Sequence, residues 1–143
     1  MSSDDAETRA AHVAVIRRTL EAISRLDVEA ALAGVHPDLV FELPYEKAVP
    51  ALDRAGFAEL LGGLRSNFGS FEMALVELVE AVDPTVLVVR YDGDCLSLDG
   101  SVHYRNRYVA FLDFADGLIR RWREYDNPVL SRRMNEQLGA VNT

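Results

Sequence analysis

The fold is decided by residues 102–125, which read VHYRNRYVAFLDFADGLIRRWREY. In the first half of this stretch, aromatic and apolar residues alternate with arginines, so every second side chain belongs to the same face of an extended chain. The second half begins after Asp116-Gly117, a dipeptide typical of tight hairpin turns. We therefore predict two antiparallel strands, 102–114 and 118–125, joined by a hairpin turn.

Two further long strands are predicted just before this hairpin. Residues 71–82 and 85–98 are rich in valine, leucine and aromatic side chains, and Asp83-Pro84 between them is a turn signal. A second turn, 99–101, contains Gly100 and leads into the hairpin. The C-terminal half of the chain is thus predicted to be an antiparallel meander, preceded by one short strand at residues 40–43.

Helices are predicted mainly on the N-terminal side of the meander. Residues 6–26 repeat apolar side chains every three or four positions, a shorter helix covers 28–34, and a third runs from Asp53 to about residue 69. A further helix begins at Pro128, and residues 135–143 are expected to form a tail. This order indicates the α+β class: a cone-shaped, curved antiparallel sheet packed against three N-terminal helices. We expect one domain over residues 1–143, with residues 1–6 disordered.

Composition and charge exclude several classes of protein. Hydrophobic residues make up 49 % and charged residues 27 % of the 143 residues, the balance of a soluble globular domain. The 15 basic and 23 acidic residues give a net charge of −8, which disfavours binding to nucleic acid. No apolar stretch is long enough to span a membrane, and the single cysteine, Cys95, excludes a disulfide framework or a multi-cysteine zinc site. We expect a cytoplasmic protein without a metal or cofactor.

The inside of a sheet bent into a cone is a pocket, so inward-facing residues are candidates for substrate contacts. On the strand 102–114, the inward face is predicted to carry Tyr104, Asn106 and Tyr108, because the arginines between them favour water. Trp122 lies on the predicted inward face of the last strand, and Glu42 is placed at the pocket mouth. The alternative is that the aromatic residues are only part of the core and that Asn106 satisfies a backbone group.

Three charged residues are predicted to meet in this pocket: Arg90 and Asp92 from the strand 85–98, and Glu124 from the last strand. Burial raises the pKa of a carboxyl group, whereas a nearby arginine lowers it. We expect Asp92, beside Arg90, to be ionised and Glu124 to be protonated, a pair suited to general acid–base catalysis. The alternative is structural: an Arg90–Asp92 ion pair within the strand, and a Glu124 that hydrogen-bonds to neighbouring strands.

The outer face of the sheet predicts a partner subunit. Val86–Tyr91 is apolar on both faces of its strand, and Val109 and Phe111 lie on the presumed outer face. An open face of this kind is an unusually large exposed apolar patch for a monomer. We therefore expect a homodimer formed through the convex face of the sheet.

Two short motifs add a family resemblance. Residues 116–119 (DGLI) and 123–128 (REYDNP) resemble the SnoaL-like branch of the nuclear-transport-factor-2-like superfamily, and are most similar to the phenazine-biosynthesis A/B proteins. The resemblance implies a pocket for a small hydrophobic, oxygenated molecule and cofactor-independent acid–base catalysis, namely cyclisation, isomerisation or condensation. Glu124 matches the glutamate that phenazine-type proteins use as an acid, whereas their helix histidine falls near Leu60.

Other branches of the superfamily supply alternatives. Limonene-epoxide-hydrolase-like enzymes use an aspartate–arginine–aspartate triad, which Arg90-x-Asp92 together with Glu124 resembles, although their water-holding residues fall at Val40 and Glu42. Ketosteroid isomerases place a general-base aspartate at the position of Leu43, which argues against that activity. A non-catalytic dimeric ligand-binding protein is the remaining alternative, because one fold hosts many functions.

Overall fold

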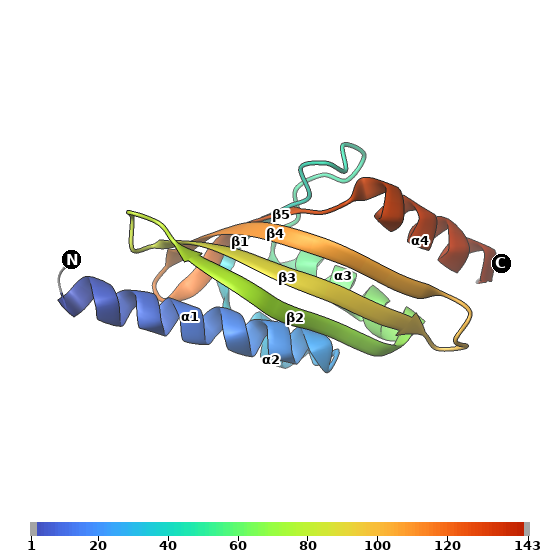
Figure 1. The fold of residues 1–143 in the computed structure, drawn as a ribbon, viewed down its shortest axis with the longest axis horizontal. Coiled ribbons are helices and arrows are strands. Elements are labelled where there is room, and N and C mark those ends of the chain that lie inside the picture. Colours follow the sequence, from blue (N-terminus) through green and yellow to red (C-terminus); the bar gives the residue numbers. More distant parts are fainter. Residues whose placement is uncertain (1–2, 142–143) are drawn as a thin grey trace.

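The computed structural model describes residues 3–141 (Figure 1). Its helices are α1 (Ser3–Ser24), α2 (Val28–Leu32), α3 (Arg54–Asn67) and α4 (Pro128–Val141). Its strands are β1 (Val35–Glu42), β2 (Phe68–Glu80), β3 (Val86–Ser97), β4 (His103–Ala115) and β5 (Leu118–Tyr125). The α+β class and the predicted order of helices followed by an antiparallel meander are confirmed.

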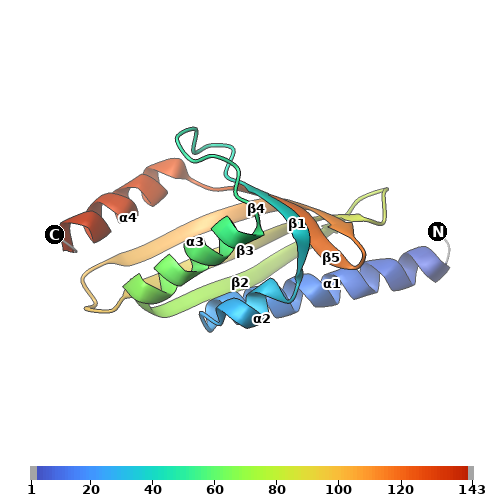
Figure 2. The same ribbon diagram turned by 180° about the vertical axis from the view of Figure 1, so that it is seen from behind.

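The strands form one five-stranded sheet in the order β1-β5-β4-β3-β2. Strands β2 to β5 pair antiparallel with their neighbours, whereas β1 pairs parallel with β5. The hairpin between β4 and β5 turns at Asp116 and Gly117, whose φ angles of 54° and 77° are tolerated by these two residue types. Figure 2 shows α3 lying across one face of the sheet with α1 and α2 beside it, so these helices cover part of the concave face.

Aspartates fix the starts of α2 and α3, as their positions in the sequence predict. The Asp27 side chain accepts a hydrogen bond from the Ala30 amide at 3.1 Å, and Asp53 accepts one from the Gly56 amide at 2.8 Å. Each bond satisfies a helix N–H that has no partner within its own helix. Asp53 thus fixes where α3 begins, and α3 forms one wall of a cavity beneath the sheet.

Both terminal helices are longer than predicted. α1 begins at Ser3, so residues 3–6 are helical rather than disordered, and two acidic residues in the first turn favour this helix end. α4 continues to Val141, where a tail was predicted from residue 135, because Met134 and Leu138 pack against the core. Residues 1–2 and 142–143 lie outside the described residues.

Strand β1 also begins earlier than predicted, at Val35 rather than Val40. Its parallel pairing with β5 shifts register between these two residues, and Pro37 lies within the irregular segment. Proline has no N–H to donate to a neighbouring strand, so it is accommodated where regular pairing is interrupted. The alternation read from the sequence covers only the regular end of the strand.

A second irregularity changes which residues of β5 face inward. Pairing between β4 and β5 shifts after Asp113, so Arg120 is an extra residue on β5. As a result, Ile119 and Trp122 are both buried although they are three residues apart. Strict alternation from Trp122 would place Leu118 and Arg120 on the inward face of β5, but the extra residue puts Ile119 in the core instead.

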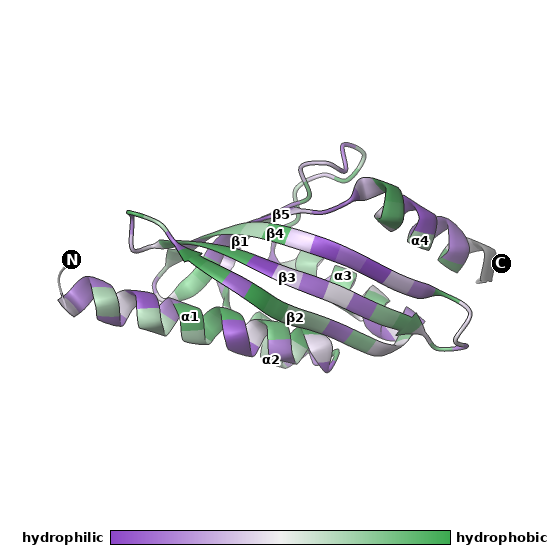
Figure 3. Cartoon of the chain, viewed as in Figure 1, coloured by the Kyte–Doolittle hydropathy of each residue, from purple (hydrophilic) through white to green (hydrophobic). Residues whose placement is uncertain are grey.

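Burial alternates along β3 and β4. Tyr104, Asn106 and Tyr108 of β4 are buried with exposed arginines between them, as predicted. On β3, Tyr91 is buried on the concave side, which places its sequence neighbours on the convex side. Figure 3 shows hydrophobic and hydrophilic residues interspersed along β2, β3 and β4.

Candidate functional site

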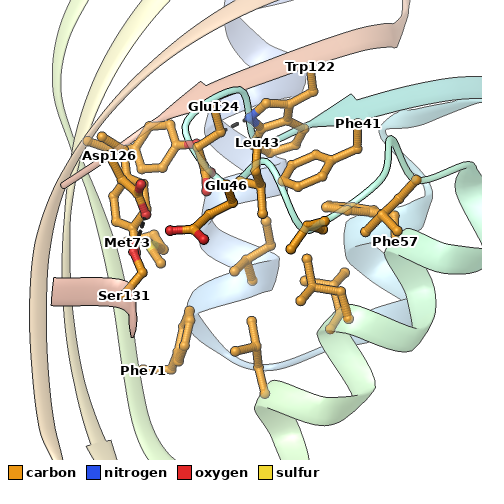
Figure 4. A pocket seen from close by; sticks show the side chains of 18 of the residues that line it. Phe41, Leu43, Glu46, Phe57, Phe71, Met73, Trp122, Glu124, Asp126 and Ser131 are labelled. Carbon is orange, nitrogen blue, oxygen red and sulfur yellow. Dashed lines mark hydrogen bonds between the residues drawn. The ribbon is translucent and has the colours of Figure 1, made fainter. Parts of the chain in front are cut away.

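A cavity of about 230 Å³ lies between the concave face of the sheet, α1, α3, the loop from β1 to α3, and the start of α4 (Figure 4). Most of its wall is apolar and includes Phe41, Phe57, Leu60, Leu61, Leu64 and Phe71. The volume is below the roughly 300–1,000 Å³ of sites for drug-sized ligands. The cavity therefore suits a compound of one or two rings.

A chain of hydrogen bonds crosses the sheet at one end of the cavity. Trp122 Nε1 donates to the Tyr91 hydroxyl oxygen at 3.2 Å, and the Tyr91 hydroxyl donates to Oε2 of Glu124. Trp122 and Glu124 are two residues apart on β5 and therefore share its inward face. Tyr91 reaches them from β3, and its ring is stacked on Tyr108 with 5.2 Å between the ring centroids.

Burial changes the acid strength of both groups in the Tyr91–Glu124 pair. Burial raises the pKa of Glu124 from 4.5 to about 7; the hydrogen bond from Tyr91 opposes this shift, and the nearby Asp126 carboxylate adds to it. The pKa of Tyr91 is raised well above 10, chiefly by burial and then by the charge of Glu124. Tyr91 is therefore a neutral hydrogen-bond donor near pH 7, whereas Glu124 titrates there.

A second polar network lies between β4 and α4. The hydroxyl oxygens of Tyr104 and Tyr108 are 2.7 Å apart, and Asn106 Nδ2 donates to the Tyr104 hydroxyl at 2.7 Å. Ser131 Oγ donates to Asp126 Oδ2 at 2.6 Å and lies 3.5 Å from the Tyr104 hydroxyl. Burial raises the pKa of Tyr104 and, further still, that of Tyr108, so both phenols are neutral. The network fixes the polar end of the cavity.

Glu46 is a site residue that the sequence reasoning missed. It lies in the loop between β1 and α3, where its amide donates to the Leu43 carbonyl at 2.9 Å. Its carboxylate lines the cavity, and Oε1 is buried without a hydrogen bond from any described residue. Figure 4 shows the side chain pointing from the loop toward Glu124 and Asp126. In the sequence, a glutamate beside Lys47 in a loop has the pattern of a solvent-exposed residue. Apart from the turn at Pro44, the local sequence therefore does not indicate that Glu46 lies in the site.

The predicted triad is not assembled. Arg90 and Asp92 lie on the convex face of β3, on the opposite side from Tyr91, and neither lines the cavity. Arg90 Nη1 is 3.9 Å from Glu77 Oε1, a neighbour on β2, so its partner is a surface carboxylate. The prediction that Arg90 and Asp92 meet Glu124 is wrong because the inward face of this strand begins one residue later than assumed.

The remaining predicted residues divide into two groups. Glu124, Tyr104, Tyr108 and Trp122 line the cavity. Asn106 is buried behind it, where Nδ2 donates to the Asn127 carbonyl at 3.1 Å, and Glu42 instead pairs with Arg121 at 2.9 Å outside the cavity wall. Placing Asn106 and Glu42 in the pocket was therefore incorrect, since both side chains are held by protein partners elsewhere.

No group of three or more His, Cys, Asp or Glu side chains among residues 3–141 is arranged to hold a metal ion. No helix in the described part of the chain is long and apolar enough to cross a membrane.

Residues 16–122, more than half of the chain, match the sequence profile of the SnoaL-like domain. The chain belongs to the SnoaL-like domain family. This confirms the resemblance indicated by the DGLI and REYDNP motifs, the second of which lies beyond the matched residues. No match was found among curated proteins.

Solved structures similar to this SnoaL-like chain include three that are informative. PrhC from Penicillium brasilianum NBRC 6234 is 17 % identical, covering 94 % of this chain and 92 % of its own, with a TM-score of 0.83. A phenazine biosynthesis-related protein from Pseudomonas aeruginosa is 19 % identical, with coverages of 92 % and 89 % and a TM-score of 0.74. An LEH-like epoxide hydrolase from M. tuberculosis is 17 % identical, with coverages of 92 % and 95 % and a TM-score of 0.70. At these identities the likeness is one of fold.

Proposed function

We propose that this SnoaL-like protein binds a small hydrophobic, oxygenated molecule in its cavity, and that Glu124 exchanges protons with that molecule. The observation that carries the proposal is a carboxyl group whose pKa is raised to about 7 at the polar end of an apolar cavity. Such a group is present in both protonation states near neutral pH, so it can act as a general acid or a general base. Strongly perturbed pKa values in a cleft are typical of functional sites.

Each neighbour of Glu124 has a role in this proposal. Tyr91 donates to Oε2, which leaves Oε1 as the oxygen that exchanges a proton with the ligand. Trp122 donates to the Tyr91 oxygen and thereby keeps the tyrosine proton directed at Glu124. The apolar wall formed by α3 excludes water and keeps the carboxyl group poorly solvated, which maintains its raised pKa.

The reactions that fit one positioned carboxyl group and no cofactor are cyclisation, isomerisation and condensation. Each requires removal of a proton from carbon or oxygen and its return elsewhere, which a single group near its pKa can accomplish. The biosynthetic protein from Pseudomonas aeruginosa that shares this fold supports a role in making a small molecule. We therefore place the protein among cofactor-independent acid–base catalysts.

Epoxide hydration by the predicted triad is not supported. Two of its members, Arg90 and Asp92, lie on the convex face, and none of the described cavity-lining residues is an arginine. The second candidate is therefore a binding protein of another class, which holds its ligand without turning it over. The same cavity serves both functions, so only the contribution of Glu124 to turnover separates them.

The deciding experiment compares the wild-type protein with Glu124→Gln against a panel of small cyclic ketones, enols and phenols. Removing a positioned general acid or base lowers the rate by roughly 10²–10⁴-fold, while the isosteric amide preserves the fold. Glu59→Gln is the matched control, because this side chain is exposed on α3 and does not line the cavity. Full turnover by Glu124→Gln overturns the catalytic role, whereas binding without turnover by both proteins favours the non-catalytic function.

We also propose that the protein is a homodimer joined through the convex face of the sheet. Val79 of β2 and Phe111 of β4 are exposed at 48 % and 36 %, and Val109 beside them is half-buried. Covering such residues with a second subunit removes apolar surface from water. Sedimentation equilibrium should give twice the mass of one chain, and a monomer at micromolar concentration contradicts the proposal. A cytoplasmic location stays a prediction from the sequence.

A further inference from the structure

The cavity has an unusual balance of charge. Three acidic side chains line it, Glu46, Glu124 and Asp126, and none of the described residues that line it is lysine, arginine or histidine. A ligand carboxylate or phosphate in this cavity therefore meets acidic groups and no counterion. Like charges in a poorly solvated site repel each other strongly, so the cavity disfavours anionic ligands.

The three acidic groups differ in what holds them. Asp126 Oδ2 accepts from Ser131 Oγ at 2.6 Å, and Glu124 Oε2 accepts from Tyr91. Glu46 Oε1, by contrast, is buried and accepts no hydrogen bond from a described residue. A buried acceptor without a donor is costly, and a ligand that supplies the donor removes this cost.

These acidic groups gather at one end of the cavity. Figure 4 shows Glu46 near Glu124 and Asp126 on one side, with Phe57 on the opposite side. Phe57 belongs to the apolar wall that α3 contributes. The cavity thus combines an end that accepts hydrogen bonds with an end that accommodates an apolar ring.

We infer that the hydrophobic, oxygenated ligand of this cavity also carries a protonated amine, and that Glu46 binds the amine. This inference rests on the proposed small-molecule function and names the class of its ligand. An ammonium group offers three N–H donors and a positive charge, which match a cluster of carboxylates with a spare acceptor. A hydroxyl group offers one donor and no charge, so it matches the same cluster less well. The net charge of −8 also attracts cations toward the protein.

The test uses three probes that share one apolar body: 4-phenylbutylamine, 4-phenyl-1-butanol and 4-phenylbutanoate. Calorimetric titration at pH 8 keeps the amine protonated and lies above the pKa of about 7 of Glu124. We expect the amine to bind at least about tenfold more tightly than the alcohol, and the carboxylate to bind most weakly, because charge-assisted hydrogen bonds are about twice as strong as neutral ones.

Variants assign this preference to Glu46. In Glu46→Gln the amine should lose most of its advantage, while the affinity for the alcohol stays close to that of the wild-type protein. Glu59→Gln removes the same charge from the exposed surface of α3 and should keep the full preference for the amine. A preference that survives Glu46→Gln unchanged overturns the assignment to this residue.

The outcomes with the wild-type protein separate the inference from the function on which it rests. Equal binding of alcohol and amine, or tighter binding of the carboxylate, overturns the amine inference while leaving the small-molecule cavity in place. Failure of all three probes to bind at millimolar concentration argues against both. Amine binding combined with unchanged turnover in Glu124→Gln supports the inference and contradicts only the catalytic role of Glu124.

Discussion

The Tyr91 hydroxyl donates a hydrogen bond to Oε2 of Glu124, and the two side chains come from β3 and β5, which are separated by β4. Burial makes this tyrosine a neutral donor across the physiological pH range and raises the pKa of its partner to about 7. A donor that stays protonated beside an acid that titrates fixes the position of the acid in both of its states. Single substitutions at Tyr91 and Glu124 therefore test the acid–base proposal.

Replacing Tyr91 with phenylalanine should raise the pKa of Glu124 further. The hydrogen bond from Tyr91 favours the ionised carboxylate, so its loss leaves burial unopposed. The indole Nε1–H of Trp122 also loses its acceptor, so we expect the free energy of unfolding to fall by about 1–3 kcal/mol. Carbon-13 NMR titration of the Glu124 carboxyl group measures the pKa directly. A pKa that falls or does not change in Tyr91→Phe contradicts this role of the hydroxyl.

The pKa of Glu124 also predicts how stability depends on pH. Below about pH 4.5 the group is protonated in both the folded and the unfolded protein, so burial carries no charge penalty. Between about pH 4.5 and 7 the unfolded chain ionises first, and wild-type stability falls. Glu124→Gln is neutral throughout, so its stability relative to the wild-type protein should rise over this window and then level off. The rise is a few kcal/mol at most, since one pKa unit corresponds to about 1.4 kcal/mol.

Urea denaturation of both proteins at pH 4.5, 6 and 8 measures this difference. Glu59→Gln, which removes an exposed carboxylate on α3, serves as the control and should track the wild-type curve. A stability difference between Glu124→Gln and the wild-type protein that does not change with pH means that Glu124 is not the buried, titrating group.

The inward face of β4 was predictable because arginines at alternate positions identify the side that faces water. On β3 the same reasoning failed, since Val88 and Val89 make both faces apolar at the start of the strand. Because side chains alternate along a strand, an error of one residue moves every side chain to the other face. Arg90 was therefore assigned to the cavity, which Tyr91 in fact lines.

The acidic end of the cavity was only partly predictable. Glu124 was found because it lies two residues after Trp122 on a strand whose regular end kept its alternation. Glu46 and Asp126 lie outside regular strands, in segments whose side-chain directions depend on how loops and α4 pack. The bulge at Arg120 was likewise invisible, because it arises from pairing with β4 rather than from local sequence. Periodicity predicts the faces of regular elements and carries no information about these segments.

Arg90 and Asp92 are the two members of the predicted triad that lie outside the cavity. Removing their charges should not change the affinity of the protein for its ligand. Arg90→Gln and Asp92→Asn each change a side chain on the convex face of β3, and the Arg90 side chain is 39 % exposed. We expect the affinity for 4-phenyl-1-butanol to stay within about twofold of the wild-type value, because neither side chain lines the cavity. Calorimetric titration of each variant measures it. A tenfold loss of affinity in either variant restores these residues to the site.

Asn106 should act on the stability of the fold rather than on ligand affinity. Its Nδ2 donates to the Asn127 carbonyl at 3.1 Å, and its Oδ1 accepts from the Asn127 amide at 3.2 Å, so it ties β4 to the residue before α4. Asn106→Ala removes both bonds, so the Asn127 amide loses its acceptor while the Asn127 carbonyl keeps its bonds from Ser131, and we expect the free energy of unfolding to fall by about 1–3 kcal/mol.

The affinity of the folded Asn106→Ala protein for 4-phenyl-1-butanol should change little, because the side chain does not line the cavity. Asn106→Asp is the informative companion variant, since it keeps the acceptor, loses the donor and places a second acid 3.4 Å from Asp126 Oδ2, where Nδ2 now lies. Its loss of stability should exceed that of Asn106→Ala and grow with rising pH, because burial at this position disfavours the ionised form of the introduced carboxyl group. Thermal denaturation at pH 5 and pH 8, paired with calorimetric titration, separates the two effects. A large loss of affinity in a stable Asn106→Ala protein shows instead that Asn106 contacts the ligand.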